Sequence, residues 1–186
     1  MVTVKPGLSL AEFLKLSEEK PALEYEEGVV SQKVPPKGHH STLQLTLASV
    51  INAWAKPEKR AYAFPELRAT FAGRSYVPDV SVYRWDRIPR DPSGEVADDF
   101  LLPPDLAIEI VSPGQGVTGL VRRCLWYVAN GVTAALLVDP GDRSILLFRA
   151  EHAPLAFSGE DRLDLSDVLP GFALSAGELF AALTLG

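Results

Sequence analysis

Two short apolar runs in the middle of the chain each contain one interior carboxylate, and this feature constrains the fold more than any other. Asp79 lies in VPDVSVY at 77–83, and Glu109 lies in DLAIEIV at 105–111. Both runs have the length and the β-branched composition of strands and are bounded by Pro or Gly. An ionised carboxylate in such a strand costs free energy unless it is paired with a cation or binds a metal.

The alternation of side chains along each run separates an aliphatic face from the face that carries the acid. In the second run Leu106, Ile108 and Ile110 lie opposite Glu109, and the first run shows the same alternation around Asp79. If the two strands pair side by side, the Cβ atoms of the two acids come about 5 Å apart. Two carboxylates at that distance can bind one divalent ion, so the pattern predicts the site of a metal-dependent hydrolase.

Structural roles explain the same two acids without any catalysis. A Pro-Asp pair such as Pro78-Asp79 is common at turns. A glutamate in a strand is often an edge residue or the partner of a cation. The spacing of the acids does not by itself decide between these roles and a catalytic site.

The composition is that of one globular domain over residues 1–186, because a chain of this length can bury a single hydrophobic core. Hydrophobic residues make up 47% of the chain, and no apolar run approaches the length needed to cross a membrane. The N-terminal segment MVTVKPGLSLAEF has no basic region followed by an apolar stretch, so we expect no signal peptide. The single cysteine, Cys124, excludes an internal disulfide, and the expected location is the cytoplasm.

The net charge of −6 bears on the choice of partner. A negative charge and a pI near 5.1 have the wrong sign for strong non-specific binding to DNA. The same charge counts less against a nuclease, because an acidic metal site contributes negative charge that its cation offsets.

The first half of the chain predicts two helices and several strands. A capping box of Ser9 and Glu12 begins a helix that ends near 20–21, and Ser41 with Gln44 begins a second helix that ends at Ala55. A hairpin is expected at 23–34, around a Glu-Gly turn. The runs at 61–64, 67–71 and 77–83 are expected to form an antiparallel meander, and the segment 85–100 an exposed excursion.

The second half predicts a β-α-β unit. A helix over 117–130 ends at Gly131, and it joins the strand of Glu109 to a parallel strand at 134–138. A further strand at 144–149 forms a hairpin with the latter, and a short helix over 175–183 closes the chain. In the helix at 117–130, Arg122, Arg123 and Trp126 point away from the expected apolar face.

Several segments resemble the Uma-type putative restriction endonuclease family, a branch of the PD-(D/E)XK nuclease superfamily. The matching segments are LEYEEGVV at 23–30, VPDVSVY at 77–83, AIEIVSP at 107–113, WYVANGVTAALLVDP at 126–140 and LSDVLPGFALSAGELF at 165–180. The resemblance implies an α/β fold with a restriction-endonuclease-like core, in which helices flank a mixed β-sheet. It also implies hydrolysis of DNA phosphodiester bonds with Mg²⁺ or Mn²⁺.

The resemblance assigns roles to particular residues. Asp79, Glu109 and the backbone carbonyl of Ile110 match the metal ligands, which suit the preference of Mg²⁺ for oxygen. Glu24 matches an acid near the metal site, although it is also explained as a solvated charge on a strand. His40 matches a histidine that could donate a hydrogen bond or a positive charge to the scissile phosphate, although histidines at such a helix start are often only exposed.

The chain departs from the superfamily pattern at its lysine. Val111 stands two positions after Glu109, where the superfamily has lysine. In the family a lysine often lies on the next helix, four residues before a tyrosine, and here that position is Arg123. Arginine can bind phosphate through two nitrogens, but its pKa above about 12 makes it a poor general base. Arg123 is therefore expected to stabilise phosphate charge, unless it is an ordinary solvated residue.

Two functions of different class follow. The first is a metal-dependent DNA endonuclease that uses Asp79, Glu109 and Arg123. The second is a nuclease-fold protein without hydrolytic activity that binds nucleic acid or assembles with itself. A nuclease for RNA or branched DNA would share the same site. A homodimer is expected for the endonuclease, because cutting both strands needs two sites.

Overall fold

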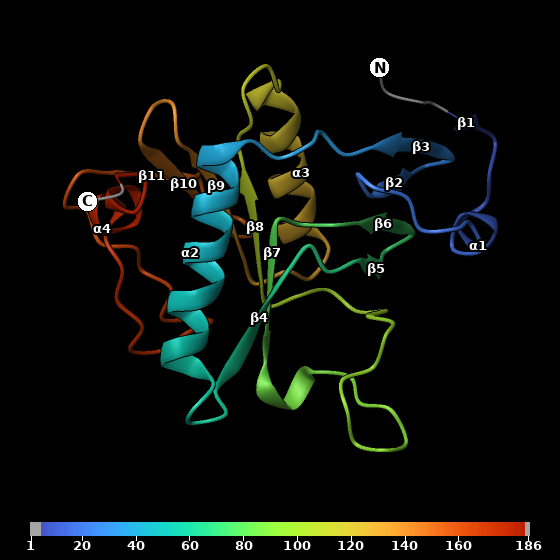
Figure 1. The fold of residues 1–186 in the computed structure, drawn as a ribbon, viewed down its shortest axis with the longest axis horizontal. Helices are drawn as coiled ribbons and strands as arrows, with labels where there is room; N and C mark the ends of the chain where they lie inside the picture. Colours follow the sequence, from blue (N-terminus) through green and yellow to red (C-terminus); the bar gives the residue numbers. More distant parts are fainter. Residues whose placement is uncertain (1–4, 185–186) are drawn as a thin grey trace.

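The computed structural model describes residues 5–184, which form two β-sheets and four α-helices (Figure 1). The expected absence of a signal peptide concerns a segment whose first four residues lie outside this range. The larger sheet has the order β11-β10-β9-β8-β7-β4, and the smaller has the order β1-β3-β2-β6-β5. No helix of the described residues is both long and apolar enough to span a membrane.

The larger sheet is mixed, as expected from the sequence. Its strands are β4 (Ala61–Pro65), β7 (Val80–Arg84), β8 (Leu106–Ile110), β9 (Ala134–Asp139), β10 (Ser144–Phe148) and β11 (Leu155–Ser158). β8 and β9 are parallel, and all the other neighbours in this sheet are antiparallel. α3 (Val117–Ala129) connects β8 to β9, and this confirms the β-α-β unit. The short α4 (Ala176–Ala181) closes the chain, with Ser175 as its N-cap.

The smaller sheet lies to the right in Figure 1 and is antiparallel throughout. Its strands are β1 (Lys5–Pro6), β2 (Leu23–Glu26), β3 (Val29–Gln32), β5 (Ala69–Phe71) and β6 (Arg74–Tyr76). β2 and β3 form the expected hairpin around Glu27 and Gly28, both of which have positive φ. Positive φ at both central residues is the geometry of a tight hairpin turn.

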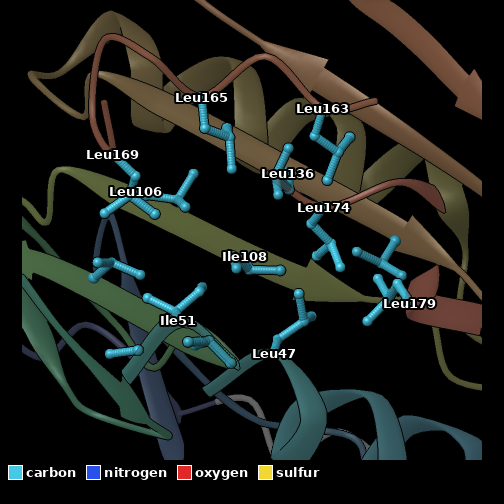
Figure 2. Close-up of a cluster of buried hydrophobic side chains, with 14 of the residues drawn as sticks. Leu47, Ile51, Leu106, Ile108, Leu136, Leu163, Leu165, Leu169, Leu174 and Leu179 are labelled. Carbon is cyan, nitrogen blue, oxygen red and sulfur yellow. The ribbon is translucent and has the colours of Figure 1, made fainter. Parts of the chain in front are cut away.

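Both faces of the larger sheet are covered by helices, so that β8 is buried along its whole length. Leu47 and Ile51 of α2 (Gly38–Ala55) pack on the face that carries Leu106, Ile108 and Leu136 (Figure 2). α4 packs on the same face as α2. α3 covers the opposite face, where Tyr127 and Cys124 pack against alternate residues of β8 and β9. Glu109 points to this second face, as does Ala107 two residues before it on β8.

The expected meander of 61–71 and 77–83 is wrong. β4 pairs directly with β7 in the larger sheet, whereas β5 pairs with β6 in the smaller one. Two local features separate the sheets. Glu66, directly after β4, has φ +47°, which turns the chain away from the sheet, and Ala72-Gly73 makes a tight turn between β5 and β6. The predicted single central sheet thus has a second, antiparallel sheet beside it.

Two predicted helix boundaries and the predicted exposure of one segment also differ. α1 (Leu10–Phe13) has the capping box of Ser9 and Glu12 but ends at Phe13, the only residue that it buries. A helix this short with so little tertiary contact does not propagate. α2 begins at Gly38, so Ser41 is not its N-cap. The segment 85–100 is only partly exposed. It begins with a 3₁₀ turn (Trp85–Arg87), and its Ile88 and Phe100 are buried.

Candidate active site

Asp79 and Glu109 are adjacent at one end of the β7–β8 pair. The antiparallel register places Val80 opposite Ile108, and its continuation by one residue brings Asp79 opposite Glu109. β7 begins at Val80 rather than at Val77, because Pro78 has no N–H to donate to a neighbouring strand. Asp79 and Glu109 are each only 2% exposed. Their burial means that each carboxylate requires a protein or ligand partner.

Three donors surround the carboxylate of Asp79. Lys33 Nζ lies 2.7 Å from its Oδ1. The Ile110 N–H donates to its Oδ2 at 2.7 Å, and His40 Nε2 lies 3.0 Å from the same oxygen. The backbone carbonyl of Asp79 is also held, because Gln44 Nε2 donates to it at 2.8 Å. Gln44 is the residue that the sequence assigned to a capping box, and in the structure it fixes the start of β7 instead.

Glu24 and Arg123 form a buried ion pair beside the two acids. Arg123 donates from both terminal nitrogens, at 3.0 Å to Glu24 Oε1 and 2.7 Å to Oε2. Glu24 Oε1 also accepts the N–H of Val77 at 3.0 Å. Leu120, Cys124, Tyr127 and Val128 are the buried residues of α3, as expected, and Arg123 lies outside that face without being a solvated charge. Its guanidinium turns into the site and lies 4.5 Å from the ring centroid of Tyr76.

Glu109 is held from α3. Tyr127 donates its hydroxyl to Glu109 Oε1 at 2.7 Å, and Arg123 lies 3.6 Å from the same oxygen. Among the hydrogen bonds of residues 5–184, none ends on Glu109 Oε2. The family-like spacing of four residues between Arg123 and Tyr127 therefore brings both side chains to one carboxylate, as i and i+4 positions of a helix require.

The two acids differ in their affinity for protons. Burial raises the pKa of Glu109 to about 7, because the charge of Arg123 offsets the loss of solvation only in part and the charge of Asp79 adds to it. Burial also acts to raise the pKa of Asp79, but the hydrogen bond from His40 and the charge of Lys33 outweigh it, so that this pKa lies below its usual value. Of the two acids, Asp79 therefore holds its proton less tightly than Glu109.

The structure brings together all the residues that the resemblance assigned. Glu24, His40, Asp79, Glu109, Ile110 and Arg123 all line one cavity of about 130 Å³. Sequence reasoning missed Lys33, which lines the same cavity from the residue after β3. No local pattern marks Lys33, because its partner Asp79 is 46 residues away. It also missed the role of Tyr127, although the Tyr lies in a segment matched to the family.

The residues fit a divalent cation in kind, since Asp79, Glu109 and the carbonyl of Ile110 offer the oxygen donors that Mg²⁺ prefers. The carboxylate oxygens, however, are mostly occupied by donors from the protein itself. Both oxygens of Asp79 already have protein donors, and only Glu109 Oε2 is free of one among the described residues. Within residues 5–184, no group of three or more His, Cys, Asp or Glu side chains is arranged to hold a metal ion. A cation at this site would therefore compete with Lys33 or His40 for Asp79.

The comparisons with known proteins agree with one another. The profile of the family described as "Uma2: Putative restriction endonuclease" matches residues 10–177. The crystal structure of a putative nuclease belonging to DUF820 from Anabaena variabilis ATCC 29413 is 40% identical to this chain. The match covers 96% of this chain and 100% of that chain, with a TM-score of 0.92.

Two further comparisons add nothing to this assignment. A cryo-EM structure of a DrdV–DNA complex is 13% identical, with a TM-score of 0.40, and covers 77% of this chain and 11% of that chain. This likeness supports no inference about the chain. A comparison with proteins of curated function gives no match.

Proposed function

Because the chain belongs to the Uma2 family of putative restriction endonucleases, we propose that it is a metal-dependent nuclease that hydrolyses DNA phosphodiester bonds at Asp79 and Glu109. The family and the similar nuclease structure support a nuclease function in general. The observation that carries the finer proposal is the adjacency of two buried carboxylates at the ends of neighbouring strands, in one small cavity.

In this proposal Asp79, Glu109 and the Ile110 carbonyl hold Mg²⁺ or Mn²⁺. When bound, the cation supplies positive charge against the phosphate and lowers the pKa of water. The protein fixes the geometry. The Ile110 N–H orients the carboxylate of Asp79, and the Tyr127 hydroxyl orients that of Glu109, so that each carboxylate has a fixed orientation in the cavity.

The reaction joins a water oxygen to phosphorus while the bond from phosphorus to the leaving strand's oxygen breaks. The water loses one proton, and the leaving oxygen gains one. Positive groups that face the phosphate favour this step, because negative charge grows on its oxygens in the transition state. Arg123 keeps Glu24 neutralised within the site, and its direct contact with phosphate stays a prediction, since both its terminal nitrogens are bonded to Glu24.

One observation favours a second candidate, a nuclease-fold protein that binds nucleic acid or itself without cutting. The acids of the site already have partners within the protein, because Asp79 contacts Lys33 and His40 and Glu24 contacts Arg123, as in a purely structural polar network. Such a network would hold the sheet edges together and would gain nothing from a cation. Metal binding separates the two candidates.

Calorimetric titration with Mn²⁺ and Mg²⁺, with plasmid nicking assayed in the same samples, tests the proposal. Wild type is expected to bind metal and nick, and the double variant Asp79→Asn, Glu109→Gln to do neither. The matched control is Asp105→Asn. Asp105 directly precedes β8, is buried like the two site acids, and pairs with Arg87 away from the site. This control is expected to lose stability and yet to keep metal binding and nicking.

Each outcome discriminates between the candidates. Metal-dependent nicking that both site substitutions abolish supports the nuclease. Metal binding without nicking on plasmid, RNA or branched DNA supports the inactive module. Absence of metal binding by wild type refutes the metal-dependent proposal.

We further propose that the nuclease acts as a homodimer, because cleavage of both strands of a duplex needs two sites. Size-exclusion chromatography with light scattering is expected to give twice the mass of 20.2 kDa. A monomer at micromolar concentration would contradict this.

A further inference from the structure

Lys33 is unlike the other lysines whose exposure the structure describes. The side chain of Lys33 is only 11% exposed, whereas Lys15, Lys20, Lys37, Lys56 and Lys59 are exposed. It lies at the end of β3, where its N–H still pairs with the Ala22 carbonyl. From there the side chain crosses from the smaller sheet to the larger one. An ammonium group in this position serves either the packing of the two sheets or the chemistry of the cavity.

The contacts of Lys33 leave one of its donors unused. Its ammonium has three N–H groups. One lies on Asp79 Oδ1 and one on the Val77 carbonyl, both at 2.7 Å. Among residues 5–184, no third acceptor lies within hydrogen-bond distance of Nζ. Because Lys33 lines the cavity that contains Asp79 and Glu109, an oxygen of a ligand in that cavity is the natural third acceptor.

The other nitrogen donors of the cavity are less available. Arg123 gives one N–H of each terminal nitrogen to Glu24, so that its guanidinium is fixed on that acid and its charge is matched there. His40 uses Nε2 on Asp79, and its Nδ1 is fully buried without any partner in the described structure. A substrate in the cavity cannot reach that nitrogen. Lys33 is therefore a cation beside Asp79 that keeps a free donor and is not fixed on one carboxylate by two hydrogen bonds, as Arg123 is.

We propose that Lys33 contacts the scissile phosphate with its third N–H and stabilises the charge that develops there. The inference rests on the proposed nuclease function and adds a residue that the family-like pattern does not mark. It gives the positive charge of the site to a residue on the smaller sheet, in place of the lysine that Val111 replaces. The smaller sheet then contributes this cation to a site whose proposed metal ligands belong to the larger sheet.

The salt dependence of DNA binding tests this contact without any cleavage. A fluorescein-labelled duplex of about 20 base pairs is titrated with protein in EDTA at several NaCl concentrations, and fluorescence anisotropy gives Kobs. Loss of one phosphate contact makes the slope of log Kobs against log[NaCl] less negative by about 0.9. Lys33→Met is expected to show this change. Lys59→Met, which removes the same charge beyond the end of α2, is expected to keep the wild-type slope.

A second variant keeps the test valid if Lys33→Met does not fold. Lys33→Gln retains N–H donors toward Asp79 and Val77 but has no charge, so the packing role is preserved and the phosphate contact is weakened. It is expected to show the same change of slope, and plasmid nicking with Mg²⁺ is expected to fall about 100-fold. Circular dichroism and urea unfolding establish that each variant is folded.

The results separate this proposal from the nuclease proposal. An unchanged slope in a folded Lys33 variant overturns the phosphate contact, even if wild type nicks plasmid. A wild type that does not bind the duplex at low salt overturns the contact as well. A slope that depends on Lys33, in a wild type that binds metal but does not nick, supports the contact and refutes hydrolysis.

Discussion

The ion pair of Glu24 and Arg123 gives the sharpest prediction about stability. The Glu24 side chain is 4% exposed and the Arg123 side chain 20%. Replacement of Arg123 by Met removes two charge-assisted hydrogen bonds, each worth about 1.5–3 kcal/mol. It leaves Glu24 with only the Val77 N–H as a donor. Removal of one partner from a buried pair typically costs about 3–5 kcal/mol, and the partial exposure of Arg123 favours the lower half of that range.

Urea unfolding followed by circular dichroism measures this cost. Arg123→Met is expected to lower the free energy of unfolding by about 3–4 kcal/mol at an unchanged m-value. Glu24→Gln in the Arg123→Met background removes the orphaned charge, so the double variant is expected to lose clearly less than the sum of the single losses. The control is Glu58→Gln, which breaks the exposed pair of Glu58 with Arg60 and is expected to cost less than about 1 kcal/mol.

A loss of unfolding free energy in Arg123→Met that is no larger than the loss in Glu58→Gln would contradict this prediction. That result would mean that water reaches Glu24 when the arginine is absent, and the site would then be open rather than buried. If the double variant loses the sum of the two single losses in unfolding free energy, Glu24 and Arg123 do not stabilise each other, although their side chains are in contact.

Four further predictions follow from the structure. Burial raises the pKa of Glu109 from its ordinary 4.5 to about 7, so the stability that its protonated form contributes is complete below pH 4.5 and is lost as pH rises toward 7; urea unfolding from pH 4 to 8 is expected to show wild type falling relative to Glu109→Gln, and a constant difference would contradict this. Tyr127→Phe deprives Glu109 of a donor at 2.7 Å and is expected to cost about 1–3 kcal/mol in the same assay. Leu136→Ala opens a cavity at the centre of the core and is expected to cost about 2–5 kcal/mol, with Leu155→Ala on the exposed edge strand near zero as its control. Ser175→Ala removes the N-cap of α4 and is expected to cost about 1 kcal/mol, with Ser175→Asp retaining most of the wild-type stability.

The sequence predicted the strands of the larger sheet best. The alternation around Glu109 and the β-α-β unit from 105 to 138 were both confirmed, because aliphatic periodicity and turn residues act over a few neighbouring positions. The capping boxes at Ser9 and Ser175 depend on equally local hydrogen bonds, although only the first was recognised from the sequence.

The wrong predictions concern sequence patterns that are compatible with two different local structures. The Ser41–Gln44 pattern is a valid capping box, but Gln44 binds the Asp79 carbonyl and α2 begins three residues earlier. The runs 61–64 and 67–71 have strand composition, yet the turn at Glu66 sends them into different sheets. Tertiary contacts decide such cases, because the alternatives differ little in local free energy.

The sequence by itself determined that Asp79 and Glu109 belong to buried runs, one directly before β7 and one in β8, and that each requires a partner, since burial of a carboxylate is costly wherever the chain places it. Only the tertiary structure decided which groups are those partners. Lys33 reaches Asp79 across 46 positions, and Arg123 reaches Glu24 across 99. A cation attracts an acid through space and leaves no periodic trace along the chain, so the charges of the site become visible only when the two sheets and α3 are assembled.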